Sequence, residues 1–210
     1  MTSIASVALE ATDPRATEAL CTALGVDAHV GVRASDAPTT GFRGYTLSLV
    51  VSQPSTVDVL IATALDHGAT TLKPATKSFW GYGGAVRAAD GSIWKVATSS
   101  KKDSGPPTRR IDDLVLLLGV ADVKASKRFY VERGLTVGKS FGSKYVEFAT
   151  PPAGVKLALY GRRALAKDVG VSPEGTGSHR IALGSDAEPF TDPDGFAWET
   201  AALRAGQPEL

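Results

Sequence analysis

The sequence predicts an α+β fold made of two homologous halves, and three observations support this prediction. A tight turn leads into a tryptophan-bearing strand twice, as RAADGSIWKVAT at residues 87–98 and as FTDPDGFAWET at 190–200. A strand, an Asp-capped helix and a stopping glycine also follow one another twice, over residues 4–25 and 114–134. Between the two copies lies SSKKDSGPPTRR at 99–110, which has the composition of a solvated connector.

The expected boundaries follow from this connector. Two halves are predicted at 1–99 and 111–203, joined by a linker at 100–110 and followed by a tail at 204–210. The hydrophobic content of 43% is enough for a core, and the net charge of +1 gives no reason to expect nucleic acid or an anionic membrane as partner. With one cysteine and no apolar run of about 20 residues, the chain is expected to be soluble, cytoplasmic and free of membrane spans.

In the first half, the alternation of apolar residues and the helix-start and helix-stop signals predict five strands and two helices. Asp13 and Pro14 open a helix that ends at Gly25, and Gly68 closes a second helix. The remaining expectations are strands at 4–11, 29–33, 45–51, 79–87 and 92–98, helices at 14–24 and 57–67, and a loop at 34–44.

The second half restarts the same order. Asp122 is the expected N-cap of its helix, and Gly134 the residue that stops it. The other expectations are strands at 114–120, 145–149, 155–160 and 180–184, a helix at 123–133, a helical turn at 162–167 and the strand after the DPDG turn.

Comparing the halves predicts complementary deletions. Residues 47–49 pair with 181–183 in this comparison, and Trp94 pairs with Trp198. The first half then lacks a hairpin like that of 145–160, and the second lacks a helix like that of 57–67. Each half alone would leave apolar surface uncovered, so the halves are expected to pack on each other.

Three stretches together resemble a known family. They are GVADVKASKRFY at 119–130, HGATTLKPATKSFWGYGG at 67–84 and DPDGFAWE at 192–199. Together they are similar to the glyoxalase/bleomycin-resistance/extradiol-dioxygenase group, the vicinal oxygen chelate superfamily. The resemblance implies βαβββ modules, paired so that curved sheets enclose a cleft. Enzymes of the family hold a divalent metal there, and other members bind drugs without metal.

The resemblance also assigns the positions where the family carries metal ligands. In this sequence they fall on Ser6, Thr46, Lys95, Val115, Arg180, Glu199 and a position near Ala158 or Tyr160. A divalent site needs three or more His or carboxylate ligands, which this set does not supply. No cofactor is therefore expected, with a divalent metal as the less favoured alternative. A one-residue register slip would bring His179 to the ligand face, which still gives only two ligands.

Glu199 is the candidate catalytic residue. Its strand alternates, which places it on the sheet face opposite Phe196 and Trp198, where a charge needs water, a partner or a ligand. Arg180 is its expected neighbour, and the alternative is that the two form only a neutralised ion pair. The candidate ligand-binding residues are Arg180, Trp80, Tyr82, Thr46, Lys95 and His179. Trp80 and Tyr82 are expected to form the apolar wall, the alternative being that they pack within the fold.

Two functions follow from these expectations. The first is a glyoxalase/bleomycin-resistance-like protein that binds a small, partly aromatic organic molecule in a sheet-lined cleft without metal. The alternative is a lyase, isomerase or dioxygenase of the same superfamily, metal-dependent or assisted by Glu199 as acid or base. The expected partner is thus a small molecule, and the sequence leaves open both catalysis and a homodimer.

Overall fold

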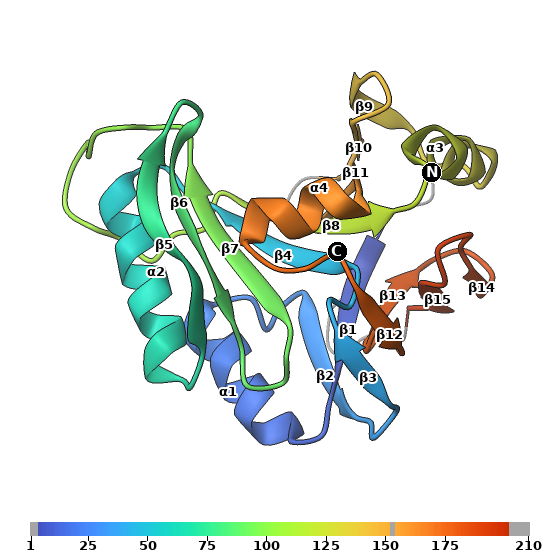
Figure 1. Cartoon of the computed structure of the whole chain (residues 1–210), viewed down its shortest axis with the longest axis horizontal. Helices are drawn as coiled ribbons and strands as arrows, with labels where there is room; N and C mark the ends of the chain where they lie inside the picture. The colour runs from blue at the N-terminus through green and yellow to red at the C-terminus, as the bar shows by residue number, and fades with distance from the viewer. Residues whose placement is uncertain (1–3, 152–153, 202–210) are drawn as a thin grey trace, which may run out of the picture.

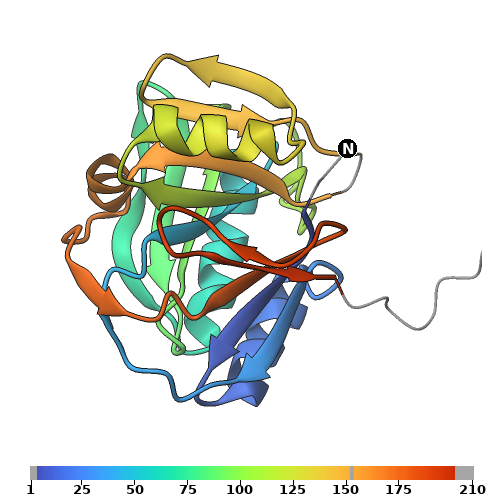
Figure 2. The same cartoon turned by 90° about the vertical axis from the view of Figure 1, so that its right-hand side faces the viewer.

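The computed structural model describes residues 4–151 and 154–201 (Figures 1 and 2). Its strands form an eight-stranded sheet, a five-stranded sheet and a two-stranded ribbon within these ranges. The predicted tail at 204–210 and Pro152-Ala153 of the predicted hairpin loop lie outside the described residues. No helix in the described part of the chain is long and apolar enough to cross a membrane.

The eight-stranded sheet consists of two complete βαβββ modules. The first module is β4 (Tyr45–Val50), α2 (Pro54–Asp66), β5 (Thr70–Ser78), β6 (Gly81–Arg87) and β7 (Ile93–Thr98). The second is β8 (Asp113–Val120), α3 (Val123–Glu132), β9 (Val137–Phe141), β10 (Tyr145–Phe148) and β11 (Lys156–Gly161). In each module the first strand lies parallel to the last, and β4 joins β8 antiparallel with Leu47 opposite Leu116.

The five-stranded sheet is built from the two ends of the described chain. The N-terminal part supplies β1 (Ile4–Ala11), α1 (Pro14–Leu24) and β2 (Val30–Ala34). The C-terminal part supplies β13 (Ile181–Ser185), β14 (Phe190–Thr191) and β15 (Ala197–Thr200). β1 and β13 pair antiparallel at the centre of the sheet. The two-stranded ribbon joins β3 (Thr39–Gly41) to β12 (Gly175–Gly177), and α4 is the helix Arg162–Val169.

This arrangement confirms the α+β fold of paired modules with complementary deletions. The N-terminal unit stops after β2 and so lacks the hairpin, while β13 to β15 lack the helix. Trp94 and Trp198 take equivalent positions, because Leu47 pairs with Trp94 in parallel strands as Leu183 pairs with Trp198. The halves associate by sharing both sheets, since each sheet contains strands from either side of the linker (Figure 1).

The same pairing corrects one predicted correspondence. Leu47 is equivalent to Leu183 and not to Ile181, so the counterpart of Thr46 is Ala182 and not Arg180. An alternating strand looks the same after a shift of two residues, and therefore its pattern alone does not fix the register.

Five short or polar strands were not predicted, namely β3, β5, β9, β12 and β14, and β3 lies within the predicted loop at 34–44. Most β5 and β9 side chains are exposed, so no buried alternate face marks them in the sequence. The helices were predicted well at their N-caps: the Asp13 carboxylate accepts from the backbone N–H of Ala16, and that of Asp122 from Ala125. α2 begins earlier than expected, at Pro54, and α4 extends further, to Val169.

The DPDG turn connects the five-stranded sheet to α3. The Asp192 carboxylate accepts from the backbone N–H of Phe196 at 2.8 Å and from the Tyr130 hydroxyl at 2.5 Å. The Asp194 carboxylate accepts from the backbone N–H of Ala121 at 2.7 Å and from the Ser126 hydroxyl at 2.9 Å. The turn therefore fixes the C-terminal strands of the five-stranded sheet against α3 of the second module.

The connector between the halves is held against α2. The Gln53 side chain accepts from the backbone N–H groups of Ser104 and Gly105 and donates to the Pro106 carbonyl at 2.7 Å. The Asp103 carboxylate accepts from the backbone N–H of Ser55 at 2.7 Å, at the N-terminus of the helix, where a negative charge is favourable. These contacts fix a segment whose composition alone suggests a free linker.

Candidate functional site

The eight-stranded sheet has a cleft on the face opposite its core. Leu47 and Leu49 of β4 point into the core, and alternation sends Thr46 and Ser48 to the other face. A cavity of about 310 Å³ lies there, and a second one of about 150 Å³ continues toward the β5–β6 hairpin. Both are lined by Lys95 and Asp168, which makes them two parts of one cleft.

The floor of the cleft holds two buried hydroxyl groups without partners. Thr46 is 0% exposed and Ser48 7%, and neither hydroxyl has a hydrogen-bond partner among the described residues. Ser48 is directly beside Lys95 in the register of β4 and β7. A buried polar group without a partner is costly, so such groups mark a place where water or a ligand hydrogen-bonds.

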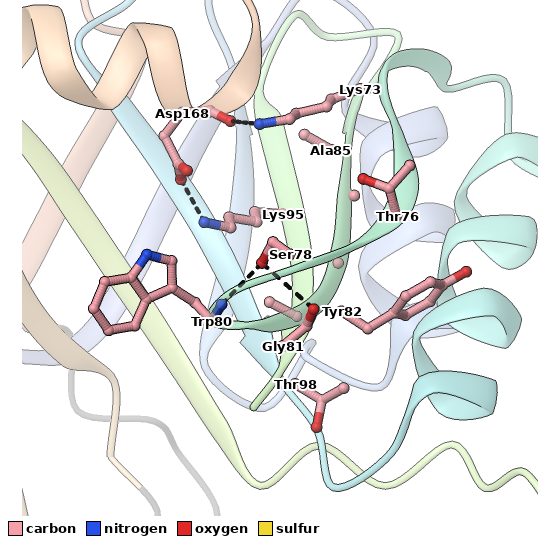
Figure 3. A pocket seen from close by; sticks show the side chains of 13 residues that line it. Lys73, Thr76, Ser78, Trp80, Gly81, Tyr82, Ala85, Lys95, Thr98 and Asp168 are labelled. Atoms are coloured by element: carbon pink, nitrogen blue, oxygen red, sulfur yellow. Dashed lines mark hydrogen bonds and ion pairs between the residues drawn. The ribbon is translucent and has the colours of Figure 1, made fainter. Parts of the chain in front are cut away.

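Helix α4 covers one end of the cleft. Its apolar side chains Leu165, Ala166 and Val169 are buried, in a cluster that includes Leu117 and Tyr160 of the sheet. The Asp168 carboxylate forms an ion pair with Lys95, and Lys73 donates to the Asp168 carbonyl at 3.1 Å (Figure 3).

The second module supplies the far wall. The Tyr145 hydroxyl donates to Glu147 at 2.8 Å, and Lys139 lies 3.4 Å from the same carboxylate. Lys156 pairs with Asp113 at 2.8 Å. Desolvation first and the hydrogen bond to Glu147 second raise the pKa of Tyr145, so this phenol is a neutral hydrogen-bonding group in the cleft.

The two predicted aromatic wall residues lie differently. Figure 3 shows the Trp80 indole on the side of Lys95 and Asp168, while Tyr82 extends toward α2. The Tyr82 hydroxyl donates to Asp58 of α2 at 2.7 Å, which raises the pKa of the phenol. Both residues line the smaller cavity, but the Tyr82 ring is turned away from Trp80, because Tyr82 shares the helix-facing side of β6 with Val86.

Glu199 lies on the other sheet, away from this cleft. It projects from the open face of the five-stranded sheet, where Arg33 donates to its carboxylate at 2.8 and 2.9 Å. Arg33 also donates to Glu10 at 2.5 and 3.0 Å. The hydrogen bond from Arg33 is the main cause that lowers the pKa of Glu199, which is opposite to what a general base at neutral pH needs. The predicted partner, Arg180, does not contact it.

Arg180 is instead a structural residue. Its guanidinium donates to the Ala37 carbonyl at 2.7 Å and to the Ser35 carbonyl, and its side chain is almost fully buried. Its backbone has φ 55°, an uncommon value for a residue with a side chain. This positive φ interrupts the alternation just before β13 and turns the side chain toward the 34–38 loop.

His179 is likewise held by the protein itself. Its ring nitrogens face the carbonyl oxygens of Arg43 and Asp194, and the ring stacks on Phe196 at 4.0 Å between centroids. A metal ligand needs a nitrogen lone pair directed to open space, and both ring nitrogens of His179 face backbone carbonyl oxygens. The register slip that would bring His179 to the ligand face does not occur, since β13 begins at Ile181.

The donor set does not fit a metal ion. On the cleft face, the positions that the family resemblance assigns to ligands hold Thr46, Lys95, Val115 and Ala158. Ser6 and Glu199 belong to the five-stranded sheet. Across residues 4–151 and 154–201, no group of three or more His, Cys, Asp or Glu side chains is close enough to hold a metal.

Sequence reasoning therefore found Thr46, Lys95 and Trp80 in the cleft but missed Ser48, Asp168 and Tyr145. A signal for Tyr145 was present, because Tyr145 and Glu147 alternate with the buried Val146 and Phe148. No comparable signal existed for Asp168, whose position depends on how α4 folds back over the sheet.

The comparison with solved structures identifies the fold. Neither family models nor curated protein sequences give a match. Among solved structures, glyoxalase I from Zea mays matches with a TM-score of 0.59 at 13% identity, over 94% of this chain and 91% of that chain. A dioxygenase candidate from Bacillus subtilis matches with a TM-score of 0.56 at 11% identity, over 89% and 71% of the two chains. The predicted resemblance to the vicinal oxygen chelate superfamily is thereby confirmed at the level of the fold.

Proposed function

We propose that this protein binds a small, partly aromatic organic molecule, without a metal ion, in the cleft of the eight-stranded sheet. The observation that carries the proposal is the pair of hydroxyls of Thr46 and Ser48, which have no hydrogen-bond partner in the described part of the chain and lie on the floor of a cavity of about 310 Å³. A ligand that hydrogen-bonds to them would remove the cost of leaving buried polar groups unpaired. Few convergent polar groups within a partly apolar cavity are typical of small-molecule sites.

Trp80 supports an aromatic component in the ligand. Its indole is 83% exposed at one end of the cleft, although an indole gains free energy when an apolar surface covers it. Leu117 and Ala97 supply apolar surface in the same cleft, and the Tyr145 ring lines its far side.

The proposal predicts that Trp80→Ala weakens ligand binding about tenfold, the loss of roughly one stacking contact. Aromatic fragments would first be screened by thermal shift, and the best binder titrated by the fluorescence of Trp80. The other two tryptophans, Trp94 and Trp198, are 1% exposed, so a soluble quencher reports mainly on Trp80. Titration of the variant would use calorimetry.

A matched control is available in the neighbouring residue. Phe79 is 81% exposed and touches the Trp80 ring at 5.0 Å between centroids, but it does not line the cleft. Phe79→Ala should leave the affinity unchanged, and so should treatment with a chelator. An affinity that survives Trp80→Ala, or that disappears with the chelator, would contradict the proposal.

A further inference from the structure

The charged groups of the cleft differ in where their partners come from. Four lysines line it, Lys73, Lys95, Lys139 and Lys156, together with three carboxylates, Asp113, Glu147 and Asp168. Lys156 with Asp113, and Lys139 with Glu147, are pairs between strands of the sheet. Lys95 is different, because its carboxylate partner comes from α4 and not from the sheet.

The position of Asp168 does not stabilise α4. It lies in the last turn of α4, where a negative charge is unfavourable to the helix dipole. Its carboxylate points to Lys95, and its carbonyl accepts from Lys73 (Figure 3). The geometry is that of a carboxylate brought to a lysine on the floor of a binding cleft.

The hydrogen-bond donors near the Asp168 carboxylate suit an anion that has two oxygen atoms. Ser48 lies beside Lys95 in neighbouring strands, and Thr46 projects from the same face of β4. Both hydroxyls are buried donors without a partner among the described residues. A carboxylate in the cleft would accept a charge-assisted hydrogen bond from Lys95 and a further one from a hydroxyl.

We propose that the cleft is specific for an organic anion, a carboxylate attached to an aromatic body, which takes the place of the Asp168 carboxylate on Lys95. This inference rests on the proposed function and names its ligand class. The aromatic body extends toward Trp80, and Asp168 acts as an internal competitor that the ligand displaces. Since the Asp168 side chain is 37% exposed and held mainly by this ion pair, its displacement requires a rotamer change in α4 and not unfolding of the helix.

Calorimetry with two probes tests the proposal. Naphthalene-2-carboxylate and naphthalene-2-carboxamide share their shape and differ in charge. The carboxylate should bind at least tenfold more tightly than the amide, and inorganic phosphate should not bind. Lys95→Met should lower the affinity for the carboxylate to the affinity for the amide. Asp168→Asn should strengthen carboxylate binding about fivefold and leave the amide unchanged, because the internal competitor loses its charge.

Lys156 provides a matched control. Its side chain is 31% exposed and pairs with a carboxylate, as Lys95 at 32% does, and it lines the same cleft. Lys156→Met should retain most of the preference for the carboxylate. The effect of Asp168→Asn is independent of whether Lys95→Met folds, because the asparagine keeps the shape of the residue.

The outcomes separate the two proposals. Equal binding of both probes, lost in Trp80→Ala, would overturn the anion specificity and leave the proposed function in place. The same holds if Lys156→Met removes the preference as fully as Lys95→Met, or if Asp168→Asn weakens the carboxylate. No binding of either probe, together with no thermal shift from the fragment screen, would overturn both.

Discussion

The two large sheets are built from the same kind of unit but keep different groups on the face opposite the core. Lys95 and Glu199 occupy equivalent positions, since each follows its repeated tryptophan on the last strand of a module. Lys95 lies in a cleft covered by α4, whereas Glu199 lies on an open face and is paired with Arg33. The comparison teaches that the same position can serve different purposes in the two copies: in the complete modules it faces a cavity, and in the incomplete ones it forms a solvent-exposed ion pair.

The largest change in unfolding free energy is expected for the replacement of Arg180 beside the five-stranded sheet. Replacing it with Met leaves the carbonyls of Ser35 and Ala37 unpaired beside the five-stranded sheet, which should cost about 3 kcal/mol of unfolding free energy. Denaturant unfolding measures this loss. Binding of the aromatic carboxylate in the other sheet should stay unchanged. Arg33→Met is the control. The Arg33 side chain belongs to the five-stranded sheet and is 43% exposed, so its replacement should cost less than about 1 kcal/mol of unfolding free energy. Equal losses in the two variants would contradict the structural role of Arg180.

A smaller effect of opposite sign is expected at Thr46. Thr46→Val removes a buried hydroxyl without a partner and keeps the shape, so it should raise the unfolding free energy by about 1 kcal/mol. The same change should weaken carboxylate binding in calorimetry. Thr40→Val is the control, because the Thr40 hydroxyl is exposed and bonded to Thr176 at 2.8 Å. A gain in stability with no loss of affinity would show that the ligand does not use this floor.

The smallest effect is expected at Glu199. Glu199→Gln should cost well under about 1 kcal/mol, because the pair with Arg33 is exposed to solvent, and ligand affinity should not change. The pKa of Glu199 is lowered from 4.5, so the stability from this pair is present above that pH and is lost as the pH falls below it. Unfolding curves from pH 7 to pH 3 should therefore converge for the two proteins. A loss of ligand binding in Glu199→Gln would break the assignment of the site to the other sheet.

The fold was predictable because its strongest signals are local and repeated. The turns before Trp94 and Trp198, together with the caps at Asp13 and Asp122, identify the homologous halves directly. The site was only partly predictable. Thr46 and Lys95 follow from the ligand positions that the family resemblance assigns, whereas the partner of each charge depends on strand order. Two strands, β13 and β1, separate Glu199 on β15 from Arg33 on β2. Arg180 misleads because an alternating strand looks the same after a shift of two residues, and the counterpart of Thr46 is Ala182. The positive φ of Arg180 then directs the side chain away from Glu199.

The pairing of β1 with β13 also has a consequence for folding during translation. Leu9 faces Ile181 in this pair, so β1 is synthesised before its antiparallel neighbour β13 by more than the length of the eight-stranded sheet. All strands of the eight-stranded sheet lie between them in the sequence. During translation, the cleft-bearing sheet therefore has its full set of strands while β1 and α1 still lack their neighbour. The nascent segment of β1 and α1 carries an apolar strand edge until β13 has been synthesised, and unpaired edges of this kind are prone to wrong pairing.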